Sequence, residues 1–404
     1  MLSCVQRIRQ GGAHARFAAS ACMLAMPIVL ATLASSAPAS AQSPQAAAPG
    51  LPGMPPVLDA ANLYGSAGAN QLSKAVEGAL ARVYVPELRG NSVAVIDPLT
   101  RKVLGHFPVG VNPQHIVPAW DLQTLWVTNN AERRTDGTLT PIDPRTGRPG
   151  TPLTVDDPYN MYFMPDGSEA IVVAEAHERL DFRDPHTMAL HSSLKVPGCK
   201  GINHADFSAD GRYAIFTCEF TAALAKIDIV QRKVLGLLKL EGGGMPQDIR
   251  IAPDGKVFFV ADMMADGVFL IDGERFVQLG MIPTGIGTHG LYPSRDGRQL
   301  YVANRGSNKV HGARHGRGSV AVIDFASRKV VANWPIPGGG SPDMGNVSAD
   351  GGQLWLSGRF DDEVYVFDTR TGGVERIAVG KEPHGLTVWP QPGRYSLGHT
   401  GNMR

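Results

Sequence analysis

Cysteine is scarce in this sequence of 404 residues, which has only four. Two of them precede residue 42, so Cys199 and Cys218 are the only pair in the rest of the chain. The sequence has no CxxC pair, no CxxCH site for haem attachment and no GxSxG nucleophile elbow. These absences argue against a thiolate zinc motif, a covalently attached haem and a serine hydrolase of the elbow type.

Long apolar runs are also missing after residue 41, where no segment has the roughly 20 apolar residues of a membrane span. The apolar stretch at residues 22–34 (CMLAMPIVLATLA) follows a start whose only charged residues are arginines, and small residues follow at Ala39-Ser40-Ala41. This order predicts a cleaved signal peptide over residues 1–41. It contains no arginine pair, so we expect export of the unfolded chain to the periplasm or the extracellular space, with any cofactor acquired afterwards.

The sequence has no block of charge of one sign. Without residues 1–41 it has 35 basic and 37 acidic residues, and no basic cluster is interleaved with aromatic residues. Proteins that bind nucleic acids concentrate positive charge on one face. We therefore expect no nucleic-acid partner.

Glycine and proline are abundant, with 47 and 30 residues. Such a composition is typical of many short strands joined by tight turns. Residues 42–81 are predicted to be a leader and rim segment, rich in alanine and proline at first and with a short helix in its second half. Residues 82–394 carry a tandem repeat, and residues 395–404 form a tail.

The repeat is clearest at residues 301–324, where YVAN and SVAVID alternate apolar and polar residues as β-strands do. A strand like YVAN recurs at Tyr84, Trp126, Val172, Phe216, Phe259, Tyr301 and Trp355. The next strand ends each time in an aspartate, at Asp97, Asp143, Asp184, Asp228, Asp272, Asp324 and Asp368. A third strand and a fourth complete each unit, and the fourth ends in a turn such as PDG or ADG.

Seven units of four strands predict an all-β, seven-bladed β-propeller with four antiparallel strands per blade. The chain enters at a second strand (Val83) and leaves at an innermost one (residues 385–389), so its last strand should complete the first blade. The remaining residues, RYSLGHTGNMR, resemble the start of another second strand. They either compete for that place or cover one face of the propeller.

The units YVANRGSN…SVAVID…KVVANWPIPGGGSPD and VYVPELRGNSVAVIDPLTRKVLGHFPVGVNPQH resemble the YVTN-repeat β-propellers of secreted bacterial proteins. The resemblance covers roughly residues 82–394 and implies the fold without a common activity. The layout is more distantly similar to the propellers of nitrous oxide reductase and of periplasmic haem-containing nitrite reductase.

Ligands of propellers bind at the mouth of the central channel, where the loops that enter the innermost strands converge. Aligning these loops gives one polar or sulfur-containing residue per blade as the predicted ligand site: His115, Asn160, His204, Asp248, His289, Met344 and His384. Four are histidines (His115, His204, His289 and His384) and are candidate metal ligands. The alternative is that such histidines only bond neighbouring backbone.

Carboxylates on the same face are predicted to support these histidines as outer partners, which fix the tautomer of a metal-bound imidazole. They are Glu87, Glu175, Glu219 and Asp262. Histidine with a thioether suggests copper, and histidine with carboxylate suggests zinc or iron, so the cofactor stays open among these metals.

Two further features lie near this face. An insertion, SNKVHGARHGRGS, brings His311, Arg314, His315 and Arg317 and is either a lid that binds an anionic ligand or a solvated loop. Cys199 and Cys218 are expected on the same face in a disulfide, with metal-bound or unpaired thiols as the alternatives. His399 of the tail could also fold over the opening.

Three functions follow from these observations. The first is a binding or accessory protein that holds a small ligand or a metal ion at the channel mouth. The second is an enzyme, either a metal- or haem-dependent oxidoreductase or a lactonase-type hydrolase. The third is a scaffold that docks a redox or other partner protein on the loop face. Fold likeness alone does not decide between them.

Overall fold

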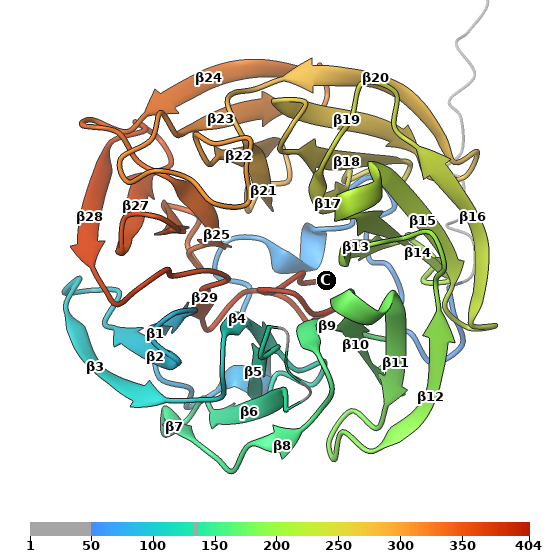
Figure 1. The fold of residues 1–404 in the computed structure, drawn as a ribbon, viewed down its shortest axis with the longest axis horizontal. Helices are drawn as coiled ribbons and strands as arrows, with labels where there is room; N and C mark the ends of the chain where they lie inside the picture. The colour runs from blue at the N-terminus through green and yellow to red at the C-terminus, as the bar shows by residue number, and fades with distance from the viewer. Residues whose placement is uncertain (1–49, 133, 135) are drawn as a thin grey trace, which may run out of the picture. The chain divides into compact units, whose positions relative to one another are not determined.

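The computed structural model describes residues 50–404 except 133 and 135 (Figure 1). The predicted signal peptide and residues 42–49 of the leader lie outside the described residues.

The described residues form 29 strands and four short 3-10 turns, and no α-helix is found among them. The 3-10 turns are η1 (Gly65–Ala67), η2 (Lys74–Val76), η3 (Glu175–His177) and η4 (Glu219–Thr221). The predicted short helix of residues 57–81 therefore amounts to two single turns. No helix in this part of the chain has the length and apolarity to cross a membrane.

Seven antiparallel sheets surround one axis, each with its innermost strand beside the axis and its outermost strand at the rim (Figure 1). The strands of the first three sheets are β1 (Arg82–Glu87), β2 (Ser92–Ile96), β3 (Val103–Pro108), β4 (Pro113–Pro118), β5 (Leu125–Asn129), β6 (Thr138–Asp143), β7 (Arg148–Pro149), β8 (Leu153–Thr154), β9 (Pro158–Phe163), β10 (Ala170–Ala174), β11 (Arg179–Arg183) and β12 (Leu190–Lys195). Those of the next two are β13 (Ile202–Phe207), β14 (Tyr213–Cys218), β15 (Ala223–Asp228), β16 (Lys233–Lys239), β17 (Pro246–Ile251), β18 (Val257–Asp262), β19 (Gly267–Asp272) and β20 (Val277–Pro283). The last are β21 (Thr288–Pro293), β22 (Gln299–Asn304), β23 (Ser319–Asp324), β24 (Lys329–Pro335), β25 (Pro342–Val347), β26 (Gln353–Gly358), β27 (Glu363–Asp368), β28 (Val374–Ala378) and β29 (Thr387–Trp389).

This arrangement is the predicted seven-bladed propeller. In the sheet that starts with β4, both β7 and β8 pair with β6, so two short strands share the outermost place. β29 pairs with β1 and supplies the innermost strand of the first sheet, with Val83 opposite Val388. The ring is therefore closed by hydrogen bonds between the two ends of the repeat region, as the sequence predicts.

The aspartate that ends each predicted second strand stabilises the turn to the third strand. Asp97 accepts hydrogen bonds from the backbone N–H groups of Leu99 and Thr100, at 2.8 and 3.1 Å. Asp324 and Asp368 bind the backbone of their own turns in the same way. An aspartate side chain that bonds the backbone two or three residues on mimics a turn, which explains why this residue recurs in every unit.

The apolar core lies between neighbouring sheets, because each sheet buries both faces. One cluster, for example, joins Tyr162 and Phe182 of one sheet to Phe207 and Phe216 of the next. Apolar residues of the tail also belong to this cluster. Burial of such side chains stabilises a fold by about 25 cal/mol for each Å² of apolar surface removed from water.

The C-terminal tail forms a hairpin that enters the central channel (Figure 1). The backbone N–H of Arg394 bonds the carbonyl of Arg404, and the N–H of Leu397 bonds the carbonyl of Asn402. The tip of the hairpin is at residues 398–401, where Gly398, His399 and Gly401 all have positive φ. The tail therefore pairs with itself and takes no place in a blade.

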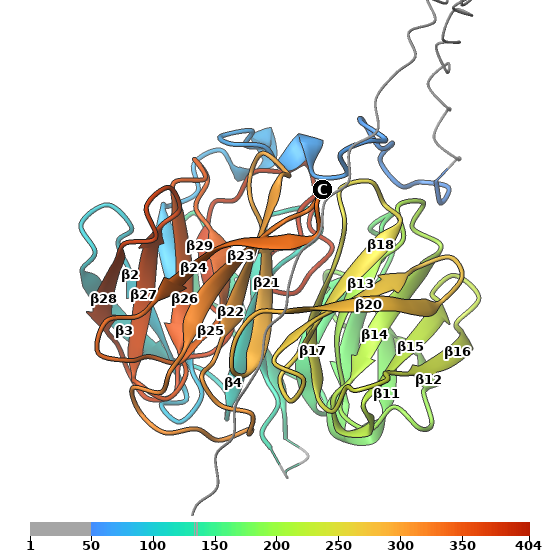
Figure 2. The same cartoon turned by 90° about the horizontal axis from the view of Figure 1, so that it is seen from above.

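The tail enters the channel at the end where the innermost strands finish. The backbone N–H of Phe163, the last residue of β9, bonds the carbonyl of Leu397 at 3.1 Å. The leader, in blue, covers this same end of the propeller (Figure 2). The opposite end, where the innermost strands begin, is the predicted ligand face.

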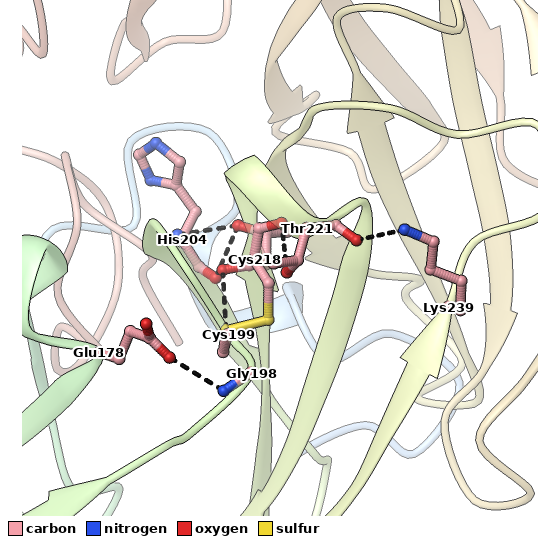
Figure 3. The surroundings of a disulfide bond; sticks show 8 residues. Glu178, Gly198, Cys199, His204, Cys218, Thr221 and Lys239 are labelled. Carbon is pink, nitrogen blue, oxygen red and sulfur yellow. Dashed lines mark hydrogen bonds between the residues drawn. A yellow bond between two sulfur atoms is a disulfide. The ribbon is translucent and has the colours of Figure 1, made fainter.

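Cys199 and Cys218 form a disulfide with Cα atoms 4.7 Å apart (Figure 3). Cys199 lies in the loop before β13, and Cys218 ends the neighbouring strand β14. The loop leads into β13, which contains His204, and the backbone N–H of His204 bonds the hydroxyl of Thr217 at 3.0 Å. Figure 3 shows the imidazole of His204 directed away from the sulfur atoms. The bridge therefore braces the backbone under His204 without contacting its ring.

Replacing both cysteines by alanine is expected to lower the free energy of unfolding by about 3 kcal/mol, because the bridge closes a loop with a sequence separation of 19 residues. Urea unfolding followed by circular dichroism measures this value. Wild-type protein unfolded in the presence of a reductant is the control and should lose a similar amount. A difference below about 1 kcal/mol would mean that the bridge is not a stability element.

Candidate functional site

The site lies where the innermost strands begin. There the pairing with the second strand shifts register, for example between Pro246 and Ile249 of β17 and between Pro342 and Gly345 of β25. Such a bulge changes the direction of the side chains next to it. Two consecutive residues per blade are therefore placed near the axis, in two layers.

Each innermost strand begins with or follows a short segment that enters the channel. The second residue of this segment belongs to the outer layer, and the third residue belongs to the inner layer. The outer layer contains Gln114, Tyr159, Asn203, Gln247, His289, Asp343 and His384. The inner layer, one residue later, contains His115, Asn160, His204, Asp248, Gly290, Met344 and Gly385. The predicted ligand residues are divided between the two layers.

The tri-imidazole cluster consists of His115, His204 and His399, all fully buried. The ring centroids of His204 and His399 are 4.6 Å apart, and those of His115 lie 5.3 and 5.1 Å from these two. One nitrogen atom from each ring lies within 4.8 Å of the others. Neither nitrogen of His115 and neither Nε2 of the other two rings has a hydrogen-bond partner in the protein.

Asn160 orients two of these rings. Its Oδ1 accepts the backbone N–H of Met161 at 2.8 Å, which fixes the direction of the amide. Its Nδ2 then lies 3.1 Å from Nδ1 of His204 and 3.0 Å from Nδ1 of His399. Because an amide nitrogen only donates, both Nδ1 atoms accept, and the proton of each neutral ring is on Nε2.

His115 requires a glycine beside it. A Cβ atom at Gly385 would lie 2.1 Å from Nδ1 of His115. The backbones are joined here, since the N–H of Ile116 bonds the carbonyl of Gly385 at 3.0 Å. The His-Gly order of this blade, with His384 in the outer layer, therefore leaves room for the imidazole of His115 in the inner one.

The acid–imidazole cluster consists of His289, Asp343 and His384 in the outer layer. Oδ1 of Asp343 lies 2.9 Å from Nδ1 of His289, and Oδ2 lies 3.5 Å from Nε2 of His384. Arg305 binds Oδ1 of Asp343 at 2.7 Å and also contacts Nε2 of His289. The two clusters adjoin, because the ring centroids of His115 and His384 are 4.7 Å apart.

Burial sets the charge of these groups. It holds the pKa of His115, His204, His384 and His399 well below the usual 6.5, and it lowers the pKa of His289 to about 4. The channel imidazoles are thus neutral at pH 7, and each keeps one lone pair. Burial opposes the ionisation of Asp343, but the guanidinium of Arg305 outweighs it and holds the pKa of this carboxyl well below its usual value. Asp343 is therefore ionised.

Two predicted ligand residues have other contacts. Met344 packs in an apolar cluster, and its sulfur accepts a hydrogen bond from the hydroxyl of Tyr292 at 3.2 Å. Asp248 lies 3.6 Å from Nε2 of His399, but its carboxylate is already bonded to Arg250 at 2.7 Å and to the backbone N–H of Leu291 at 2.9 Å. In the blade of Met344, the residue before it, Asp343, belongs to the acid–imidazole cluster.

The predicted outer carboxylates do not bond the channel histidines among the described residues. Glu87 bonds Ser92 and the backbone of Gly380, and Asp262 bonds backbone N–H groups of two loops. Glu219 bonds the amide of Asn203 at 2.9 Å. The pKa of Glu175 is well above its usual value because of burial and repulsion by Glu219.

The predicted lid binds the neighbouring blade. Arg314 donates to the backbone carbonyl of Asp361 at 2.8 Å and to the carboxylate of Asp362 at 3.3 Å, and the backbone of His315 also bonds Asp361. Arg317 forms a bridge with Gly340. For His311, no contact with the channel is found. These contacts hold the insertion against the loop that follows β26.

Sequence reasoning missed Asp343 as a channel residue and left His399 outside the ligand set. Aligning the loops on the proline that begins five of the seven segments would have found Asp343, one residue after Pro342. For His399, the available signal was a histidine between Gly398 and Gly401, two residues that allow a tight hairpin tip.

The low pKa values predict that the metal-free protein loses stability in mild acid. Five channel histidines are concerned: His115, His204, His289, His384 and His399. Between pH 6.5 and about 4 the unfolded chain binds protons at these histidines and the folded chain does not, so the free energy of unfolding rises with pH. Each histidine contributes up to about 1.4 kcal/mol per pH unit. Urea unfolding at pH 7.5, 6.5 and 5.5 with a chelator measures the slope. A profile that is flat over this range would contradict the prediction, and the exposed His186→Ala variant should keep the wild-type slope.

Comparison with known proteins agrees with this architecture. The chain superimposes on the periplasmic gluconolactonase PpgL of Pseudomonas aeruginosa with a TM-score of 0.60 and 18% identity, over 76% of this chain and 98% of that one. For the dihydro-heme d1 dehydrogenase NirN the TM-score is 0.56 and the sequence identity 15%, over 76% of this chain and 75% of that one. For hydrazine synthase of Kuenenia stuttgartiensis the TM-score is 0.54 and the sequence identity 18%, over 75% of this chain and 93% of that one.

These likenesses show the fold alone, because all three identities are low. No curated protein matches the sequence. The sequence does match one protein family, over residues 53–392, which include all seven blades and the channel loops. This chain belongs to the YNCE-like β-propeller family.

Proposed function

We propose that this propeller is an exported binding protein that holds a transition-metal ion at the tri-imidazole cluster. The proposal depends on one observation: four nitrogen atoms of three buried imidazoles have no partner in the protein, and one nitrogen atom from each ring lies within 4.8 Å of the others. A buried polar atom without a partner costs about 1–3 kcal/mol. A metal ion bound by these atoms would remove that cost.

The charge of the cluster supports a metal ligand. Neutral imidazoles bind Cu²⁺, Zn²⁺ and Fe²⁺ well, whereas protonated ones do not. The low pKa values of His115, His204 and His399 keep all three neutral at pH 7. The disulfide supports the export of the chain, since such bridges persist in oxidising compartments.

Asn160 sets a condition for metal binding. A metal at Nε2 of His204 and His399 requires the proton of each ring to be on Nδ1, where the amide nitrogen of Asn160 now lies. The amide has to turn so that its oxygen accepts from the rings, and it then loses the bond to the backbone of Met161. Metal-bound imidazoles usually donate their second N–H to an oxygen atom, so the turned amide would act as such an outer partner.

A metal-dependent enzyme is the second candidate, because three protein ligands leave a coordination position free for a substrate or for water. Tyr159 of the outer layer lies beside the cluster, with its ring centroid 5.4 Å from that of His115. The activities to test are lactone hydrolysis and electron transfer to a small redox partner. Turnover that disappears in His204→Ala with an intact fold would favour this candidate over binding alone.

The binding proposal predicts that the full protein takes up Zn²⁺ or Cu²⁺ and that His115→Ala, His204→Ala and His399→Ala each weaken this binding by more than about 100-fold, beyond the usual effect of an outer partner. Calorimetric titration at pH 7 in a buffer that does not chelate metals measures the affinity. His186→Ala removes an exposed histidine and serves as the matched control. If the three variants bind as wild type does, the tri-imidazole cluster is not the site.

A substitution at Asn160 is expected to strengthen binding. In Asn160→Asp, one carboxylate oxygen keeps the bond to the backbone of Met161, and the other accepts from Nδ1 of both rings. The Nε2 atoms are then free for the metal without a rearrangement, and we expect an affinity on the order of 10–100-fold higher. The same titration measures the change. An affinity equal to or lower than that of wild type would show that Asn160 does not control the tautomers.

A further inference from the structure

The acid–imidazole cluster contains an unusual pair of atoms that face each other. Nδ1 of His384 lies 3.1 Å from the backbone carbonyl of Gln114, which can only accept a hydrogen bond. The proton of a neutral His384 is therefore on Nδ1, and Nε2 has the lone pair. This Nε2 atom lies 3.5 Å from Oδ2 of Asp343.

Oδ2 of Asp343 has no hydrogen-bond partner although the side chain is fully buried. The other oxygen, Oδ1, bonds Arg305 and lies 2.9 Å from Nδ1 of His289. Arg359 is the other cation near Oδ2, and its Nη1 is 3.9 Å away, beyond hydrogen-bond distance. A lone pair and a carboxylate oxygen thus face each other in a buried place, which is unfavourable unless a positive charge lies between them.

We propose that His384 Nε2 and Asp343 Oδ2 are ligands of a second divalent metal ion, separate from the tri-imidazole site. A tetrahedral ion at about 2.1 Å from each ligand separates the two atoms by about 3.4 Å, close to the observed 3.5 Å. The carbonyl of Gln114 is the kind of outer partner that orients a metal-bound imidazole. Nitrogen together with carboxylate oxygen suits Zn²⁺, Co²⁺ or Fe²⁺.

The rest of the cluster limits what else binds this ion. Nε2 of His289 accepts from Arg305, so His289 is not a free ligand while Arg305 stays in place. The two protein ligands therefore leave positions for water or a small molecule. The surrounding charges balance, because Asp343 and Glu382 stand opposite Arg305 and Arg359. The ion would bring the positive charge that attracts an anionic small ligand from the mouth.

A proton on His384 is the competing explanation, since an imidazolium would also satisfy Oδ2 of Asp343. Burial and the nearby guanidinium group of Arg359 oppose this charge and hold the pKa of His384 well below its usual value. The separation of 3.5 Å between Nε2 of His384 and Oδ2 of Asp343 fits a shared metal ion, and the test below distinguishes it from a shared proton.

The test is the stoichiometry of Co²⁺ and Zn²⁺ binding to the full chain at pH 7, with the d–d absorption of Co²⁺ as a second readout. Wild type should bind two equivalents, and Asp343→Asn and His384→Gln should each bind one. Because Asp343→Asn leaves Arg305 without its carboxylate and so can unfold the protein, His384→Gln, which keeps Asp343, is the decisive variant. His204→Ala should remove the other equivalent, and His186→Ala should remove neither.

The outcomes separate this proposal from that of the tri-imidazole site. One equivalent that is lost in His204→Ala and kept in His384→Gln overturns the second site and leaves the first. One equivalent lost in His384→Gln alone supports the second site and overturns the first. If no metal binds, both proposals fall. A protonated His384 at pH 7, seen by nuclear magnetic resonance, also overturns the second site.

Discussion

Closure of the ring is the constraint on which the channel depends. Only three residue pairs join β29 to β1, yet they turn a row of blades into a circle with one axis. Residues that are whole blades apart in sequence then lie side by side, as His115 and His204 do across two blades. Each sheet also buries its faces against its neighbours, so the axis is held by the packing of the whole core.

Bulges at the start of the innermost strands give this axis its chemistry. A regular strand would direct only every second side chain to the channel, whereas the shifted register brings two consecutive residues near it. The inner layer thus supplies imidazoles to the tri-imidazole cluster, and the outer layer contains the acid–imidazole cluster with its arginine partners. In a buried environment these groups stay neutral or paired, and the atoms left without partners are concentrated at one place.

The sequence was sufficient to predict the seven four-stranded units, the closing strand and the cysteine pair, because turn residues and alternating strands are local signals. The layer of each channel residue was not predictable in the same way. The alignment matched His289 and His384 with His115, but a glycine after each of the first two shifts them by one residue. Met344 was correctly aligned with His115 in the inner layer, but the channel carboxylate of that blade is Asp343 in the outer layer. The tail hairpin depends on hydrogen bonds to the sheets of β4, β9, β13, β25 and β29, which no local pattern encodes.

The contribution of the tail makes the tri-imidazole cluster sensitive to the integrity of the chain. A product cut after Trp389 would keep every strand and could still close its circle, but it would lack the third imidazole. Cleavage of the short connection between β29 and the hairpin would thus leave a propeller without the complete cluster. The shape of the cut product would match that of the intact protein, so only the loss of the bound metal ion would distinguish the two.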